Sequence, residues 1–376
     1  MRKIIAVLCI LVLLTACVDR KYIEKLGIVT VVGYDLLEEG WLEGTMVLFQ
    51  FDPNATNISQ IIVSRAKTSK GLMQDASLKS SKELVSGQLR LVVYGKEMAE
   101  EGVMRVTDTM IRDAAIADML YLAVSETSAN EVMNTNNFED APNVGNYLYT
   151  LIQKNIQEEK IPQATLHHFV SNVYSDGKDP VLPMIKLENS KATVMNLALF
   201  RDEKMVGQIT AKEGFFLKLL QGRYQSGHLE IAIPTREIKD YIRHEANQQT
   251  REFLYMDLDE IKSQTNIELT NVDTPSFSAK VNLTARILEL SENVSLENPE
   301  VIKILEEQIS KSIEFQMEQL LQKTQKMKSD PFGFGNTYQE KVGQQSVDSK
   351  DWHELYPNIE VNFNVQVKVI RHGITD

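Results

Sequence analysis

The sequence is poor in cysteine, and its two cysteines, Cys9 and Cys17, both lie near the N-terminus. The chain after Cys17 therefore cannot form an internal disulfide. An exported domain without disulfides has to be stabilised by its own apolar core, and hydrophobic residues make up 43% of the 376 residues. A chain of this length has room for two or three domains, because a domain usually has about 100 to 200 residues.

Basic residues are scarce relative to acidic ones. Lys and Arg number 40 against 52 Asp and Glu, which gives a formal net charge of −12. Nucleic-acid binding requires Lys and Arg to neutralise phosphates, so we expect no nucleic-acid partner. We also expect no electrostatic attraction of the body to anionic lipid headgroups. After Cys17 no apolar run approaches the roughly 20 residues of a spanning helix, so we expect this part of the chain to be aqueous.

Sequence motifs of catalysis are missing as well. The sequence has no Gly-x-Ser-x-Gly elbow, no Walker loop, no zinc-protease histidine pair and no catalytic cysteine. A single sequence does not show whether a catalytic pair of carboxylates is present, because the two residues can be far apart in the chain. We predict that the protein is not an enzyme and has no catalytic residues, no cofactor and no metal site.

The N-terminus carries an export signal. Arg2 and Lys3 precede an apolar stretch at residues 4–14, which is too short to span a membrane. The stretch ends in Leu14-Thr15-Ala16-Cys17, which resembles the lipobox of bacterial lipoproteins at all four positions. The resemblance implies a signal peptide over residues 1–16, cleavage before Cys17, diacylglycerol on the Cys17 sulfur and often acylation of the new amine. An ordinary signal peptide with an incidental cysteine is the alternative.

Hydrophobic periodicity predicts an α+β fold of two or three subdomains, each a largely antiparallel or mixed sheet with flanking helices. We assign an N-terminal region, of one or two subdomains, to residues 17–190 and a C-terminal domain to residues 191–376. In the first region the patterns predict a hairpin at residues 26–52, a buried strand at 89–94, and helices at 71–86, 97–111 and 143–160.

The C-terminal half has the clearest patterns. Residues 276–290 and 358–371 alternate between apolar and polar side chains and predict long strands. Shorter patterns predict strands at 228–234 and 266–272, and we expect these two and the strand at 276–290 to be antiparallel. Asn298-Pro299-Glu300 has the composition of a helix start, and the helix extends to about Lys328. Its apolar residues recur every three or four positions, so we predict that it packs on the domain's own sheet.

Three short motifs admit both a chemical and a structural interpretation. Residues 330–335 (DPFGFG) have the glycines of a phosphate loop, but a helix precedes them where a phosphate loop needs a strand, so we predict a structural turn. His167 and His168 are adjacent and lack further metal ligands at a suitable spacing. The acidic stretch at residues 257–260 lacks the calcium-loop spacing, and we expect it to be solvated.

The chain resembles the Ger(x)C family, the lipoprotein C subunits of nutrient germinant receptors in endospore-forming bacteria. The resemblance extends nearly from end to end. The matching positions include the lipobox, Gly27-Ile28-Val29, Gly33-Tyr34-Asp35, residues 91–95 (LVVYG), residues 330–335 (DPFGFG), Trp352 and Pro357. It implies a non-catalytic subunit held beside multispanning A and B subunits in the inner membrane of the spore and needed for the germination response. No ligand-binding residues carry over, so Cys17 is the one site that we name.

A solute-binding lipoprotein of an ABC importer is the alternative function. Such a protein would share Cys17, but its lobes are built from repeated βαβ units with short buried strands. The long alternating strands predicted here argue against it. A multispanning pair of neighbouring genes would favour the receptor, and an ATPase with a permease would favour the importer.

Overall fold

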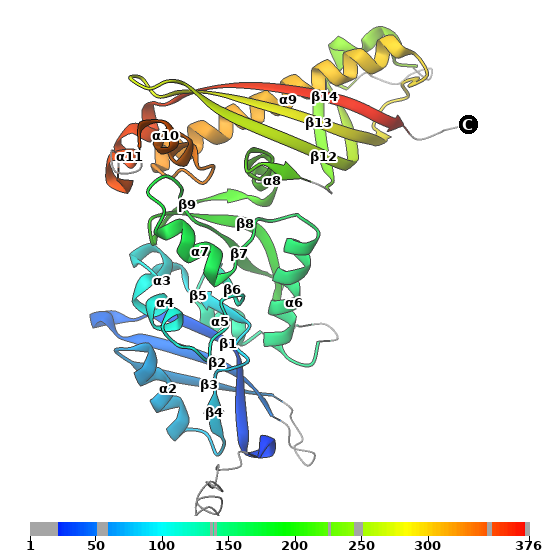
Figure 1. The fold of residues 1–376 in the computed structure, drawn as a ribbon. Helices are drawn as coiled ribbons and strands as arrows, with labels where there is room; N and C mark the ends of the chain where they lie inside the picture. The colour runs from blue at the N-terminus through cyan, green and yellow to red at the C-terminus, as the bar shows by residue number, and fades with distance from the viewer. Residues whose placement is uncertain are drawn as a thin grey trace, which may run out of the picture.

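The computed structural model describes residues 22–50, 59–135, 138, 141–224, 227–243, 251–343 and 348–372. These residues form two β-sheets that follow one another along the chain, and helices flank each sheet (Figure 1). The first sheet lies in the lower half of the view and the second in the upper half. The predicted α+β class, with mixed sheets and flanking helices, is confirmed.

The first sheet has parallel strands at its centre and antiparallel pairs at both sides. Its order is β3-β2-β1-β5-β6-β7-β8-β9, with β4 beside β1. Strands β1, β5, β6 and β7 run parallel, whereas β2 and β3 on one side and β8 and β9 on the other are antiparallel to their neighbours. The strands are β1 (Leu26–Leu36), β2 (Leu42–Gln50), β3 (Ser59–Ala66), β4 (Glu83–Val85), β5 (Leu91–Tyr94), β6 (Tyr121–Ser125), β7 (Val181–Glu188), β8 (Lys191–Arg201) and β9 (Lys204–Thr210).

Six helices accompany the described strands of the first sheet: α2 (Ser69–Leu78), α3 (Lys96–Glu101), α4 (Met104–Ile111), α5 (Ala129–Met133), α6 (Val144–Gln157) and α7 (Leu166–Val173). The helix predicted at 97–111 is two helices, because Gly102 has a φ of +131° and breaks it. The helix predicted at 71–86 ends at Leu78, and β4 follows. The hairpin and the buried strand β5 are confirmed.

The domain boundary expected between residues 190 and 191 lies in the turn of the β7–β8 hairpin. Both strands of this hairpin, and β9 after them, belong to the first sheet. The last strand of the first sheet, β9, ends at Thr210, and α8 (Ala211–Leu220) follows it and leads to the second sheet. Helix α8 contacts β8 and β9 of the first sheet and β12 and β13 of the second, so it lies between them.

The second sheet consists of β10 (Arg223–Tyr224), β11 (Leu229–Pro234), β12 (Phe253–Asn271), β13 (Ser276–Leu290) and β14 (Glu360–His372). Its order is β10-β12-β13-β14, with β11 also beside β12. The two long predicted strands are confirmed as β13 and β14. Strands β11, β12 and β13 pair antiparallel with one another in this order, as expected, whereas β14 pairs in parallel with β13. The intervening helices α9 (Pro299–Met327), α10 (Phe334–Val342) and α11 (Ser349–Leu355) form a crossover that returns the chain to the starting end of β13.

Helix α9 is confirmed, with Asn298 as its N-cap and Pro299 in its first turn. Its apolar stripe is buried, as predicted, and includes Leu305, Ile309 and Ile313. Three polar side chains, one turn apart on α9, bond the outer edge of β14. The Val369 N–H donates to Glu306 Oε1 at 2.8 Å, the Val367 N–H to Ser310 Oγ at 3.2 Å, and the Val365 N–H to Glu314 Oε1 at 2.8 Å. The helix thus satisfies three outward-facing donors of an edge strand.

Short 3-10 helices complete the described chain at Ile23–Lys25, Glu38–Gly40, Thr235–Glu237, Lys239–Tyr241 and Tyr356–Asn358. Within the described ranges, no helix has both the length and the apolar character needed to cross a bilayer.

Candidate functional site

The predicted lipid site, Cys17, and the predicted signal peptide lie outside the described residues. The described part of the chain begins at Tyr22, and the 3-10 helix Ile23–Lys25 follows it. This helix and the start of β1 lie at the end of the molecule that is far from the second sheet (Figure 1). The lipid site at Cys17 therefore remains a prediction. In the sequence Cys17 precedes the first described residue, Tyr22, by five positions.

The loop at residues 330–335 is built around the carboxylate of Asp330. The backbone N–H groups of Phe332 and Gly333 donate to Asp330 Oδ1 at 3.1 and 2.9 Å, and that of Gly335 donates to Oδ2 at 2.9 Å. The indole Nε1 of Trp352 also donates to Oδ2, at 3.0 Å. The amides do converge on an anion, but the anion is the chain's own buried carboxylate. The prediction of a structural loop is confirmed.

The sequence patterns did not predict the helix that follows this loop. Gly333 is the N-cap of α10 and has a φ of +87°, a conformation that favours glycine. Gly335, in the first turn, packs directly against the backbone of Gly177, so that a Cβ there would lie 2.5 Å from the Gly177 Cα. The glycines therefore serve a turn and a close backbone contact.

Asp179 joins this loop to the first sheet. Its carboxylate accepts the N–H of Asp330 at 2.7 Å and the N–H of Asp202 at 2.9 Å, and its own N–H donates to the Asp330 carbonyl at 2.8 Å. Asp179 precedes β7, and Asp202 lies in the turn between β8 and β9. The buried Asp179 carboxylate thus links the segment before β7 and the β8–β9 turn to the loop that follows α9.

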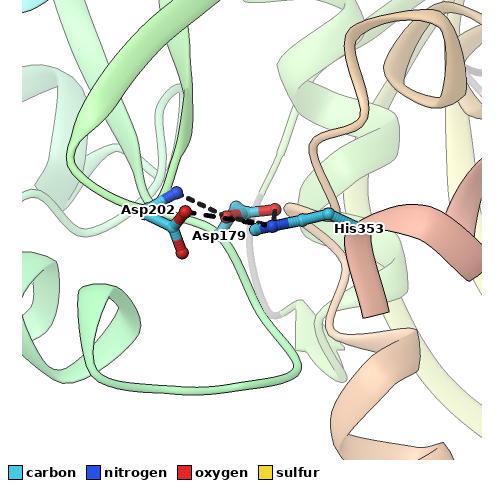
Figure 2. Close-up of side chains that lie close together, drawn as sticks. All are labelled: Asp179, Asp202 and His353. Carbon is cyan, nitrogen blue, oxygen red and sulfur yellow. Dashed lines mark hydrogen bonds and ion pairs between the residues drawn. The ribbon is translucent and has the colours of Figure 1, made fainter. Parts of the chain in front are cut away.

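His353 of α11 completes the cluster, as Figure 2 shows. Its Nε2 lies 3.1 Å from Oδ1 and 3.0 Å from Oδ2 of Asp179, and its Nδ1 lies 3.9 Å from Asp202 Oδ2. The hydroxyl of Ser349, one turn earlier on α11, donates to Asp202 Oδ1 at 2.6 Å. Asp179 and His353 are buried, whereas the Asp202 side chain is 51% exposed. The imidazole therefore stands between two carboxylates, only one of which meets solvent.

The electrostatics of the cluster follow from burial and from these contacts. Burial acts to lower the pKa of His353, but the hydrogen bond and charge of Asp179, with the charge of Asp202, outweigh it and raise the pKa. Burial raises the pKa of Asp330 to about 7, and the Asp179 charge adds to this effect, although the N–H donors oppose it. Both groups thus bind protons more readily here than in the unfolded chain.

Asp179, Asp202 and His353 are residue types that bind metals, and one ligand atom of each lies within 4.8 Å of the others. The contacts already made by Asp179 disfavour that use. Each of its oxygens accepts a backbone N–H and also faces the imidazole nitrogen. A metal ion would have to displace these donors, so the geometry is better explained as a hydrogen-bonded ion pair between protein elements.

The other motifs lie elsewhere. His167 and His168 are in α7, and burial lowers the pKa of His168. The acidic stretch at 257–260 is part of β12, which begins at Phe253, 13 residues before the strand predicted at 266–272. Asp259 forms a bidentate ion pair with Arg286 of β13. Asp179, Asp202 and His353 were missed because 174 positions separate the histidine from Asp179 and no local motif connects them.

Comparisons with known proteins cover the whole described body. Residues 19–187 match the family model of the spore germination protein N-terminal domain, and residues 195–373 match that of the spore germination B3/GerAC-like C-terminal domain. Spore germination protein GerQC of Bacillus cereus is 26% identical over 380 residues, which cover 100% of both chains. Spore germination protein KC of Bacillus subtilis (strain 168) is 21% identical over 408 residues, which cover 99% of this chain and 96% of that protein.

A solved structure has the same fold. The crystal structure of the GerBC protein superposes with a TM-score of 0.54 and covers 90% of this chain and 96% of its own. Its sequence identity is 16%, so the likeness concerns the fold.

Proposed function

Because the chain belongs to the Ger(x)C family of spore germination proteins, we propose that it is the lipid-anchored, non-catalytic C subunit of a nutrient germinant receptor. The observation that carries this proposal is the order of three features along one chain. The lipobox ends at Cys17, the match to the N-terminal family domain begins at residue 19, and the match to the C-terminal domain follows to residue 373.

The chemistry of the anchor supports a stable membrane attachment. A single acyl chain gives only marginal membrane binding, and each buried methylene contributes about 0.8 kcal/mol. A diacylglycerol on the Cys17 sulfur, with or without a third chain on the amine, exceeds that threshold. The acidic body, with a formal net charge of −12 for the chain, offers no electrostatic substitute on an anionic membrane.

The geometry of the described body supports an interaction module. The cluster of Asp179, Asp202 and His353 binds backbone and side-chain donors of the protein itself. These contacts fix the first sheet to the helices of the second. A body of two sheets fixed in this way can present surfaces at a constant distance from the membrane, where we place the multispanning A and B subunits of the inner spore membrane.

Exchange of Cys17 tests the anchor and the function together. The test variant is Cys17→Ala and the matched control is Cys9→Ala, which removes the other cysteine but leaves the lipobox intact. Incorporation of labelled palmitate, membrane fractionation of the spores and nutrient-triggered germination are measured for both variants. Receptors with overlapping nutrients are deleted from the host strain beforehand.

We expect Cys17→Ala to lose palmitate, to leave the membrane fraction and to abolish the nutrient response, while Cys9→Ala behaves as wild type. Palmitate entering both variants equally would refute the lipid site. A lipidated protein whose deletion leaves germination unchanged for every nutrient would refute the receptor role and retain the anchor.

A further inference from the structure

A pocket of about 520 Å³ is lined by residues of the first sheet and of the helices beside it. Small-molecule sites usually have about 300 to 1,000 Å³, so this volume is sufficient for a ligand. Most of the wall is apolar, and its apolar members are Ile23, Ile28, Val31, Phe49, Pro142 and Tyr149. They come from the 3-10 helix Ile23–Lys25, β1, the end of β2 and the start of α6.

Arg90 is the one charged residue among the described residues of the lining. Its backbone is fixed between β1 and β6, since its N–H donates to the Thr30 carbonyl and its carbonyl accepts the Tyr121 N–H, both at 2.9 Å. The guanidinium lies 5.4 Å from the centre of the Tyr149 ring. Arg90 is exposed, and its guanidinium forms no hydrogen bond or ion pair with any other part of the described chain, so its donors are available to an anion at the mouth of the pocket.

The wall opposite the strands is also fixed. The hydroxyl of Tyr149 accepts a hydrogen bond from Gln153 Nε2 at 2.9 Å, and its ring centre lies 5.8 Å from that of Tyr121. The Asn143 side chain caps α6 by accepting the Asn146 N–H at 2.8 Å. The first turn of α6 is part of the lining, so the positive end of its dipole adds to the charge of Arg90.

We propose that this pocket binds a fatty carboxylate, with the apolar chain against Ile28, Phe49 and Tyr149 and the carboxylate at Arg90. Charge decides between this ligand and an α-amino acid. The described lining contains no acidic side chain, so the ammonium of an amino acid would have no charged partner there. A fatty carboxylate has no such group, and its single charge matches the single cation. The proposal does not depend on lipid at Cys17.

Photolabelling tests the proposal with the full chain in isolated membranes. The probe is a dodecanoic acid that carries a diazirine on its chain, and labelled positions are mapped by mass spectrometry. Unlabelled dodecanoate, its methyl ester and leucine serve as competitors. The test variants are Arg90→Gln and Ile28→Trp, which places a bulky ring in the pocket. Arg112→Gln is the matched control, because Arg112 pairs with Asp108 on α4, outside this pocket.

We expect labels on β1, the end of β2 and the first turn of α6, with displacement by dodecanoate and not by the methyl ester or leucine. Arg90→Gln should raise the dodecanoate concentration for half displacement by about tenfold or more, because a charge-assisted bond is lost. Ile28→Trp should abolish these labels, and Arg112→Gln should change nothing. Equal labelling of Arg90→Gln, or equal competition by the methyl ester, would overturn the carboxylate site. If leucine displaced the probe at a lower concentration than dodecanoate does, the pocket would be assigned to an amino acid instead.

Discussion

The imidazole Nε2 of His353 lies 3.0 Å from Oδ2 of Asp179, although 174 positions separate the two residues in the chain. Asp179 precedes β7 of the first sheet, and His353 belongs to α11 in the crossover of the second. The contact therefore ties the two halves of the molecule together. Because one partner is a histidine, its strength depends on pH.

The first prediction concerns this pH dependence. The folded-state pKa of His353 is raised, so its contribution to the unfolding free energy is fully present below about pH 6.5, the unfolded value. The contribution is lost as the pH rises through the raised folded value. We expect chemical denaturation to show lower stability at about pH 9 than at about pH 6, and a smaller difference in His353→Gln.

Two comparisons make this test specific. His228→Gln is the control, because His228 is 57% exposed and pairs at 3.3 Å with Asp257, which is not part of the Asp179 cluster. The pKa of Asp330 is raised to about 7, so deprotonation of this carboxyl also lowers the unfolding free energy as the pH rises. Some pH dependence of the unfolding free energy therefore remains in His353→Gln. A pH dependence that is the same in His353→Gln and wild type would contradict the assignment.

The second prediction concerns the Asp330 carboxylate. In Asp330→Asn an NH₂ group replaces one of two oxygens that between them accept four N–H donors. In either amide orientation two donors face another donor, and each unsatisfied buried group costs about 1–3 kcal/mol. We expect a loss of about 2–4 kcal/mol in the unfolding free energy by urea titration at about pH 8. Asp108→Asn, in an exposed ion pair, should change it by less than about 0.5 kcal/mol.

The third prediction separates the glycines by their surroundings. At Gly335 a Cβ would lie 2.5 Å from the Gly177 Cα and 2.7 Å from Trp352 Nε1, so Gly335→Ala must push two segments apart. At Gly87 the nearest atom to a Cβ is the Ala115 carbonyl oxygen at 3.8 Å. We expect a loss of several kcal/mol, about 2–4, for Gly335→Ala and little change for Gly87→Ala in thermal unfolding. Similar melting temperatures for the two variants would be inconsistent with this packing.

The fourth prediction concerns the edge of β14. Glu306 and Glu314 accept the outward N–H groups of Val369 and Val365 at 2.8 Å. The double variant Glu306→Ala/Glu314→Ala frees these donors, and an unprotected edge strand pairs with other chains. We expect concentration-dependent self-association by analytical ultracentrifugation. Glu318→Ala, an exposed position on the same helix, is the control. A monomeric double variant would show that the two carboxylates are not needed to protect the edge.

Local patterns in the sequence were sufficient for the elements that are regular over many residues. The stripe and N-cap of α9 and the alternation of β13 and β14 predicted these elements to within two residues. Periodicity succeeds there because each element has one buried face along its length. It failed at Gly102, where a positive φ breaks a helix whose apolar pattern continues across the break.

Sequence patterns were enough to predict the α+β class, to locate the lipobox at Cys17 and to find the resemblance that the family models later supported. The parallel pairing of β13 with β14, the place of β8 and β9 in the first sheet, and the contact of Asp179 with His353 became visible in the folded chain alone. These features differ in the sequence separation of the residues that they involve. Alternation and capping depend on neighbours in the chain, whereas these contacts depend on how a 29-residue helix and its loops return the chain across the molecule.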